Sequence, residues 1–128
     1  MNNYYTLIYL NRELNEKIWH GIFDFAISPH KDVLEIYIRA DENKFRLIFS
    51  VNPSETALFL DKHRPPKKSN VLYFFQRLEG EKITEISLAE NDRLVYINFG
   101  NDRLLQFKLF GGNPNVYLVE ENVIKDAF

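Results

Sequence analysis

Two groups of charged residues in this sequence are suited to binding an anion, and the first surrounds a pair of prolines. Segment 62–68 carries four Lys or Arg side chains and one histidine around Pro65 and Pro66. Prolines fit neither a helix interior nor a central strand, so the segment is predicted to be a loop. Its cations can form charge-assisted contacts with phosphates, and the candidate residues are Arg64, Lys67 and Lys68. A solvated loop without a partner is the alternative.

The second group is the pair Asp92 and Arg93, which is predicted to lie in a turn between two strands. The planar guanidinium of Arg93 can make a bidentate contact to a phosphate or to a base edge. Asp92 can orient that arginine or accept a hydrogen bond from a nucleobase amine. Ordinary turn chemistry is the alternative interpretation of the same two residues.

A further candidate anion contact is the glycine pair Gly111 and Gly112, which Asn113 follows. Consecutive backbone N–H groups in such a turn can point at an anion. A tight connection between two strands is the alternative, and it requires no ligand.

No set of residues in the sequence predicts an active site or a metal site. The chain has no cysteine, which excludes thiolate catalysis, disulfides and cysteine-ligated zinc. Its three histidines, at positions 20, 30 and 63, lack the spacing of metal ligands. No pair of carboxylates is forced together by helical or strand spacing, and no serine has the setting of a nucleophile. We therefore expect neither an enzyme nor a cofactor.

The composition is that of one globular domain with a sheet-rich core. The 128 residues are 45% hydrophobic and 15% aromatic, and the aromatic share favours strands. The net charge of −2 means that any basic surface must be local. No signal peptide is visible and no apolar run approaches the ~20 residues of a membrane span. We therefore expect a cytoplasmic protein without a membrane partner.

Hydrophobic spacing predicts the elements that position these residues. Apolar residues at steps of three and four predict helices over 4–18 and 69–78, each followed by a glycine. Period-two alternation predicts antiparallel strands between and after the helices, with a bulge between Ile83 and Ile86. The strands are expected around residues 23–28, 34–39, 45–50, 57–60, 83–88, 95–99, 105–109, 116–119 and 123–124.

The pattern divides the chain into two similar halves, about 1–64 and 65–128, each a helix followed by strands. The predicted fold class is therefore α+β, an antiparallel β-sandwich with two flanking helices.

Several motifs resemble the N-terminal domain of the NFACT family, which is also known as fibronectin-binding protein A. In the first half, Glu13-Leu14, Gly21-Ile22 and the proline pair before the second predicted helix match more loosely. The matches in the second half are, in order, Leu78-Glu79-Gly80, Asp92-Arg93-Leu94, the stretch from Phe110 to Leu118, and the ending from Ile124 to Phe128.

The resemblance implies a fold similar to the N-terminal domain of formamidopyrimidine-DNA glycosylases. It also implies the first domain of a longer protein, a ribosome quality-control factor that binds tRNA and the large ribosomal subunit at stalled nascent chains. The residues expected to contact RNA are Asp92, Arg93, Lys67, Lys68, Arg64, Gly111, Gly112 and Asn113.

Two alternatives remain open beside RNA binding. The first is an adhesin that binds fibronectin or fibrinogen, as the family's older name suggests. The second is a catalytically inactive nucleic-acid-binding domain like the glycosylases, because their N-terminal proline nucleophile is absent from Met1-Asn2-Asn3.

The predicted elements also place the two charged groups relative to each other. A helix over 69–78 followed by a longer antiparallel strand would bring Arg93 back past the start of the helix. Lys67, Lys68 and Arg93 are then expected to form one positive patch.

Overall fold

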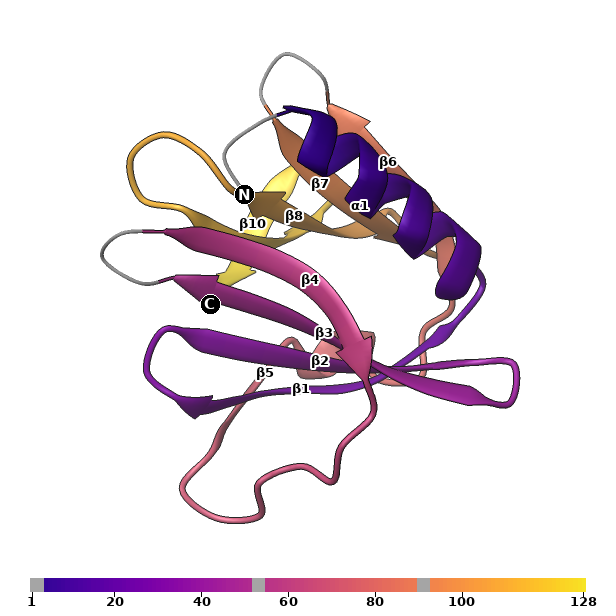
Figure 1. Cartoon of the computed structure of the whole chain (residues 1–128), viewed down its shortest axis with the longest axis vertical. Coiled ribbons are helices and arrows are strands. Elements are labelled where there is room, and N and C mark those ends of the chain that lie inside the picture. Colours follow the sequence, from indigo (N-terminus) through magenta and orange to yellow (C-terminus); the bar gives the residue numbers. More distant parts are fainter. Residues whose placement is uncertain (1–3, 52–54, 90–92) are drawn as a thin grey trace.

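Two five-stranded antiparallel sheets, here sheet A and sheet B, pack face to face, and one α-helix lies at their open side (Figure 1). The computed structural model describes residues 4–51, 55–89 and 93–128. Sheet A has the order β4-β3-β2-β1-β5 and sheet B the order β10-β9-β8-β7-β6. Because most neighbours in each sheet are consecutive along the chain, both sheets are built mainly from hairpins.

The bounds of the elements agree with most of the predicted ranges. Sheet A comprises β1 (Ile22–His30), β2 (Val33–Ala40), β3 (Asn43–Val51), β4 (Thr56–Lys62) and β5 (Leu72–Phe74). Sheet B comprises β6 (Ile83–Ala89), β7 (Leu94–Phe99), β8 (Arg103–Lys108), β9 (Asn115–Glu120) and β10 (Val123–Ala127). The remaining elements are the helix α1 (Tyr4–Lys17) and the 3-10 turn η1 (Gln76–Leu78).

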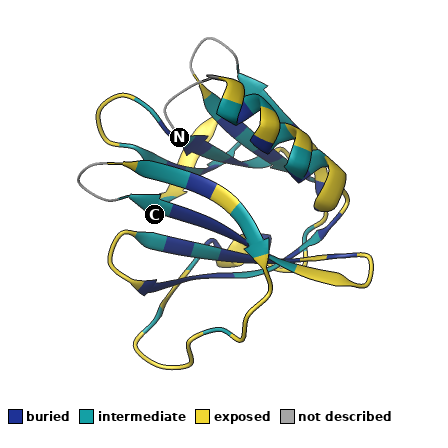
Figure 2. Ribbon diagram, viewed as in Figure 1, coloured by how far each residue is buried: buried dark blue, intermediate teal, exposed yellow. Residues whose placement is uncertain are grey.

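The core lies between the two sheets, where Figure 2 shows the buried residues gathered. Alternate residues of each strand point inward, so Leu47 and Phe49 of β3 face Leu105 and Phe107 of β8. The rings of Phe49 and Phe107 lie 6.4 Å apart between centroids, which marks the contact between the sheets.

The helix α1 closes the gap between the sheets on the side of β6. Its predicted apolar stripe is confirmed, since Leu7, Leu10, Leu14 and Ile18 are all buried in the common core. On the same side, the amide Nδ2 of Asn15 donates to the backbone oxygen of Ile86 at 3.2 Å. This bond occupies a carbonyl on the outer edge of sheet B.

Sheet B confirms a further feature predicted from the sequence and shows a tight hairpin turn. The register of β6 against β7 shifts between Ile83 and Glu85, which is the predicted irregularity. The β7–β8 turn at Asn101 and Asp102 has positive φ at both residues, as two-residue hairpins require.

The predicted helix over 69–78 is wrong. Residues 72–74 instead form β5, which pairs with β1, and only 76–78 make a single 3-10 turn. Phe75 between them has φ 54° and ψ 39°, a left-handed conformation that an α-helix cannot contain. Pairing with β1 satisfies backbone groups that so short a helix would stabilise poorly. The fold is therefore mostly β, a sandwich with one helix rather than two.

The two sheets are tied together where the start of β1 meets residues 80–83. The N–H of Gly80 donates to the oxygen of Phe23 at 2.8 Å, and the N–H of Phe23 donates to the oxygen of Glu81 at 2.9 Å. The N–H of Ile83 donates to the oxygen of Gly21 at 2.8 Å. Gly21 has no side chain at a point where a Cβ would lie 2.8 Å from the backbone oxygen of Ile18 and 3.0 Å from that of Arg39, so only glycine fits at the start of β1.

Within the described residues, no helix is both long enough and apolar enough to cross a membrane.

Candidate functional site

The structure places the predicted contact residues in two separate groups. Arg64, Lys67 and Lys68 lie in the loop of residues 63–71 between β4 and β5, here called the basic loop. Arg93 immediately precedes β7, on sheet B. Figure 1 shows the basic loop at the bottom of the molecule and the beginning of β7 near the top. Asp92 lies outside the described residues.

The single positive patch of Lys67, Lys68 and Arg93 is therefore not formed. Its prediction depended on a helix that would lead away from the loop, and the chain forms β5 there instead. Because β5 pairs with β1, the basic loop stays on sheet A while Arg93 belongs to sheet B.

The basic loop is fastened to the outer face of sheet A, the face away from the core. The ammonium of Lys67 donates to the backbone oxygen of Pro29 at 3.0 Å. The ring of His63 meets the ring of Tyr37 edge-on, with 5.8 Å between centroids. Tyr37 is buried although it points away from the core, so the outer face of sheet A is covered at this position.

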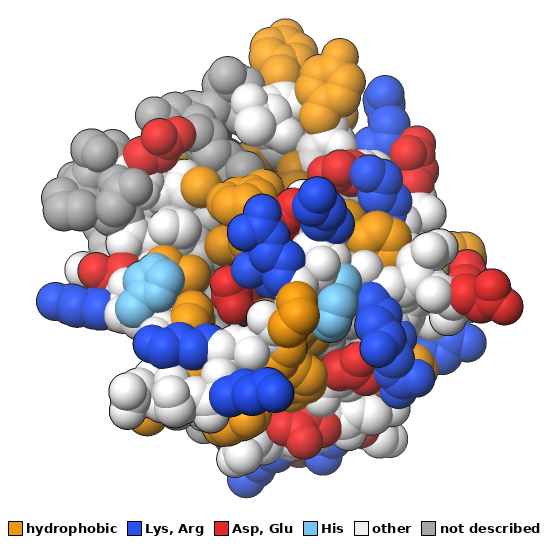
Figure 3. Space-filling model, turned by 60° about the horizontal axis from the view of Figure 1, so that its bottom comes forward, with side chains coloured by type: hydrophobic (Ala, Val, Ile, Leu, Met, Phe, Trp, Pro, Cys, Tyr) orange, Lys and Arg blue, Asp and Glu red, His pale blue; other side chains and the backbone are white. Residues whose placement is uncertain are grey.

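The other cations of this loop, and Lys62 at the end of β4, are exposed. In the described part of the chain Lys62, Arg64 and Lys68 form no ion pair, although the charge of Arg64 helps to lower the pKa of Asp61. Figure 3 shows Lys and Arg side chains spread across this side of the molecule. Their charges are therefore available on a protein whose net charge is −2.

Beneath the loop, Arg46 is the centre of a buried ion-pair network. Its Nη1 lies 2.7 Å from Oε2 of Glu35, and its Nη2 lies 2.8 Å from Oδ2 of Asp61. The hydroxyl of Tyr37 donates to Oε1 of Glu35 at 3.1 Å. Only 9% of the Arg46 surface is exposed. This network fixes three neighbouring strands of sheet A under the basic loop.

Burial and charge shift the pKa values within this network. Burial and the charge of Glu35 raise the pKa of Tyr37 to about 12. Burial alone would lower the pKa of Arg46, but the hydrogen bond with Asp61 and the charge of Glu35 outweigh burial and raise it. The hydrogen bond from Arg46 lowers the pKa of Asp61. Arg46 and Asp61 therefore stay charged, and Tyr37 stays neutral, at physiological pH.

The second group lies at one end of sheet B. The guanidinium carbon of Arg93 lies 5.0 Å from the centre of the Phe110 ring, a cation–π contact. Phe110 leads directly into Gly111, Gly112 and Asn113, so the structure brings these predicted residues together with Arg93. Gly111 and Asn113 have positive φ, which makes this connection a tight turn.

Lys108 also belongs to this group, although the sequence did not single it out. It lies in β8 opposite Leu94 of β7 and Asn115 of β9. No side-chain partner for Lys108 is found among the described residues. The alternation of side chains in β8 could have identified it. Phe107 points into the core, so Lys108, the next residue, must point to the outer face.

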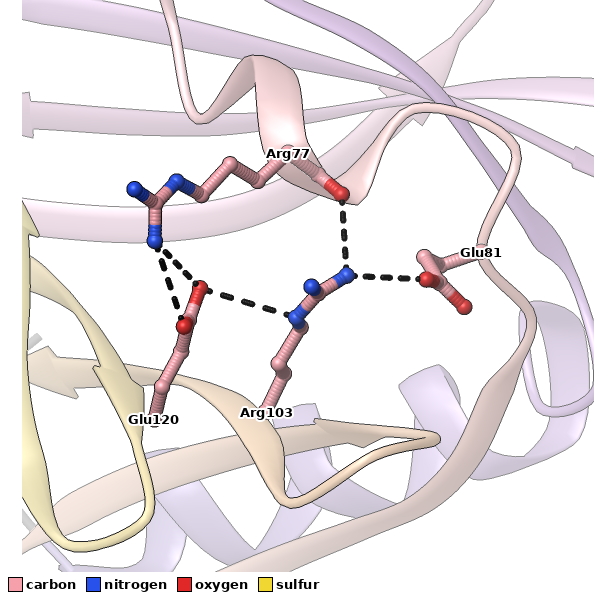
Figure 4. Close-up of polar contacts among 4 residues, drawn as sticks. All are labelled: Arg77, Glu81, Arg103 and Glu120. Atoms are coloured by element: carbon pink, nitrogen blue, oxygen red, sulfur yellow. Dashed lines mark hydrogen bonds and ion pairs between the residues drawn. The ribbon is translucent and has the colours of Figure 1, made fainter.

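A cluster of four charged residues joins η1 to sheet B, and Figure 4 shows it. Oε1 of Glu120 accepts from Arg77 at 3.2 Å and lies 3.5 Å from Nε of Arg103. Nη1 of Arg103 lies 3.0 Å from Glu81 and donates to the backbone oxygen of Arg77 at 3.3 Å. Each charge has a partner, so the cluster serves to hold the fold. No sequence pattern predicts this cluster, because its members are distant along the chain.

The described residues contain no group of three or more side chains that could hold a metal ion.

The family model described as NFACT N-terminal and middle domains matches residues 4–128. No curated protein matches the sequence.

Solved structures share the fold. The N-terminal domain of fibronectin-binding protein PavA from Streptococcus pneumoniae superposes with a TM-score of 0.82 at 23% identity, covering 96% of this chain and 54% of that one. The N-terminal part of the fibronectin/fibrinogen-binding protein from Streptococcus suis gives 0.75 at 22%, covering 94% and 51%. The fibrinogen binding protein from Staphylococcus aureus gives 0.73 at 23%, covering 94% and 48%. The chain thus spans about half the length of these structures.

Proposed function

The chain belongs to the family of NFACT N-terminal and middle domains, and we propose that it is an RNA-binding domain. In this proposal it contacts tRNA and the large ribosomal subunit within a quality-control factor for stalled ribosomes. The domain binds and positions RNA and carries out no reaction of its own. Any peptide-bond chemistry at a stalled nascent chain belongs to the ribosome.

The observation that carries the proposal is the set of free cations at the basic loop. Lys62, Arg64 and Lys68 are exposed and none of them forms an ion pair within the described part of the chain. Lys67 anchors the same loop through its bond to Pro29. A loop that is already held in place loses less conformational entropy when its side chains bind phosphates. Its positive charge is therefore concentrated on a fixed surface, as phosphate-backbone binding requires.

The group on sheet B supports the same proposal from the other end of the molecule. Arg93 is exposed, and its guanidinium is supported by the ring of Phe110. Lys108 lies near it on the outer face of the same sheet. Two separated basic groups suit a large RNA that touches the domain at more than one place.

Titration of tRNA binding against salt tests the proposal. We expect the affinity to fall as salt rises, with a logarithmic slope of about −0.7 to −0.9 for each phosphate contacted. The double variant Arg64→Ala/Lys68→Ala removes two free cations and is expected to make the slope shallower by about 1 to 2. The control is Lys17→Ala, because Lys17 is on α1 and is already paired with Glu13.

The outcome that contradicts the proposal is equally specific. An affinity that does not depend on salt, or a slope that the double variant leaves unchanged, removes the basic loop from RNA binding. A loss of affinity in Lys17→Ala equal to that of the double variant would indicate general attraction of charge rather than a site.

The names of the similar structures support a second candidate function, which is binding of fibronectin or fibrinogen. In that case the protein acts outside the cell, so it must be reachable there. Labelling of intact cells with an impermeant biotin reagent decides between the two. Recovery of labelled protein favours the adhesin, and labelling only after lysis excludes it.

A further inference from the structure

The outer face of sheet B carries two half-buried tyrosines. Val95, Ile97 and Phe99 of β7 are buried in the core. Because successive side chains in a strand point to opposite faces, Tyr96 lies on the outer face. The same reasoning places Tyr117 there, since its neighbours in β9, Val116 and Leu118, belong to the core.

The strand register aligns these residues in one row across the sheet. Tyr96 lies opposite Gln106, and Gln106 lies opposite Tyr117. Neighbouring strands are about 4.8 Å apart, so the two tyrosines lie about 10 Å apart with the glutamine between them. The whole row, here called the tyrosine row, runs Ser87, Tyr96, Gln106, Tyr117 and Ala127.

The ends of the tyrosine row are small, and Tyr96 and Tyr117 are both half-buried, so part of each ring reaches solvent. Ser87 and Ala127 flank the two tyrosines, so no bulky neighbour in the row packs against the far side of either ring. The helix α1 lies along β6 at the edge of the sheet (Figure 1). Its apolar stripe is in the core, so α1 contributes no cover to the outer face through those residues.

Free cations lie on one side of the tyrosine row. The next row of the sheet contains Leu94, Lys108 and Asn115, and Arg93 immediately precedes Leu94. Lys108 and Arg93 form no ion pair within the described part of the chain. The face therefore combines aromatic rings, a side-chain amide and adjacent positive charge.

We propose that the outer face of sheet B binds unpaired nucleotides of RNA. Two bases stack on Tyr96 and Tyr117, the Gln106 amide hydrogen-bonds to a base edge, and the phosphates contact Lys108 and Arg93. This inference rests on the proposed RNA-binding function and identifies which part of an RNA this face takes. Stacking on aromatic side chains needs exposed base faces, which single strands and loops offer and double helices do not.

The chemistry of the face favours this ligand over a protein segment. A protein partner would be expected to bury a largely apolar centre with charge depleted. Here the centre holds two tyrosines and a glutamine, with Lys108 in the row on one side and the apolar Leu104 and Val119 in the row on the other. Planar groups joined by a negatively charged backbone complement that arrangement.

Replacement of the tyrosines tests the inference with a fluorescein-labelled ten-nucleotide uridine oligomer. Tyr96→Leu and Tyr117→Leu remove the aromatic ring and are each expected to weaken binding about fivefold or more. Tyr96→Phe and Tyr117→Phe keep the ring and are expected to stay within about twofold of the wild type. The control is Tyr9→Leu, because Tyr9 is 68% exposed but lies on α1.

The salt dependence separates stacking from charge. The leucine variants are expected to lose affinity with an unchanged salt slope, whereas Lys108→Ala is expected to make the slope shallower by about 0.7. For an RNA duplex of the same length, the affinity of the leucine variants is expected to equal that of the wild type.

Binding of tRNA and of the oligomer together distinguishes failure of the tyrosine row from failure of the proposed function. If the wild type binds tRNA but the leucine variants bind the oligomer as tightly as the wild type, the tyrosine row is not a stacking surface and the proposed function stands. If the wild type binds neither RNA, the proposed function fails as well.

A second measurement on the wild type needs no variant that might misfold. Addition of the oligomer is expected to shift the ring NMR signals of Tyr96 and Tyr117 and to leave that of Tyr9 unchanged. Saturated binding without such shifts overturns the inference.

Discussion

Removal of the Arg46 side-chain charge tests whether the outer face of sheet A is held by a buried network. Arg46→Met keeps most of the aliphatic volume and removes both ion pairs, at 2.7 Å to Glu35 and 2.8 Å to Asp61. The side chain of Glu35 is only 13% exposed, so its carboxylate would remain buried, and among the described residues the hydroxyl of Tyr37 would be its one remaining partner. The Asp61 side chain is 33% exposed and water can solvate it.

The expected cost follows from these two exposures. Leaving one partner of a buried pair uncompensated costs roughly 3–5 kcal/mol. Because water can solvate Asp61, we expect a value near the lower end, about 3 kcal/mol. For a domain of this size that corresponds to a fall in Tm of about 10 °C.

A matched control lies on the same sheet. Arg39 and Asp24 form an ion pair of 2.6 Å whose side chains are 52% and 26% exposed. An exposed pair contributes about 0–1 kcal/mol, so Arg39→Met is expected to change stability by no more than that.

Urea unfolding at pH 7, followed by circular dichroism, measures both variants. A cost of Arg46→Met that does not exceed that of Arg39→Met would refute the network. Adding Glu35→Gln to Arg46→Met is expected to restore part of the lost stability, because it removes the unpaired charge. Further destabilisation by that second change would refute the reasoning in the same way.

Three further predictions concern stability. The raised pKa of Tyr37, about 12, means that its contribution to stability is complete below pH 10 and is lost as the pH rises from 10 to 12. The free energy of unfolding of wild type and Tyr37→Phe should therefore diverge over that window, by up to about 3 kcal/mol. A Cβ on Gly21 would lie 2.8 Å from the oxygen of Ile18, so Gly21→Ala is expected to cost about 1–3 kcal/mol in urea unfolding, whereas Gly100→Ala, with no atom within 4 Å, should change little. Glu120→Gln weakens the contacts to Arg77 and Arg103 and is expected to lower Tm by about 3–6 °C; equal effects of Glu121→Gln would contradict this.

The alternation of side chains was enough to predict most of the fold. In β7 buried and half-buried residues alternate over the whole strand, and β3 departs from alternation only at Arg46 and Ile48, so a single register satisfies both strands. The stripe of α1 was equally clear, because its four apolar residues all fall on one face.

The missed strand β5 has a specific cause. Helical spacing is found in Val71, Phe74, Phe75 and Leu78, but these residues do not lie on one helix. Phe75 is buried in a left-handed conformation, and Leu78 is buried in the 3-10 turn that follows it. The spacing of apolar residues in so short a segment does not show whether another strand will pair with it. Here β1 pairs with it and makes it a strand.

The candidate site could be predicted only in part for the same reason. The free cations at the basic loop could be predicted from the composition of residues 62–68. Their position relative to Arg93 could not, because it depends on the missed strand β5. The partners of Arg46 arise from strand register, which pairs it with Tyr37 on one side and Asp61 on the other. Such contacts follow from the assembled sheet and have no local motif.

The contacts of α1 across the sandwich have a consequence for the order of folding during synthesis. The indole of Trp19 donates to the oxygen of Thr84, and Asn15 donates to Ile86, so these bonds join residues 65 and 71 positions apart. The helix therefore leaves the ribosome before the strand it packs on has been made. Until β6 emerges, its four core residues lack their partners in sheet B. Contacts of such long range slow folding, so we expect completion of this domain to wait for its C-terminal strands.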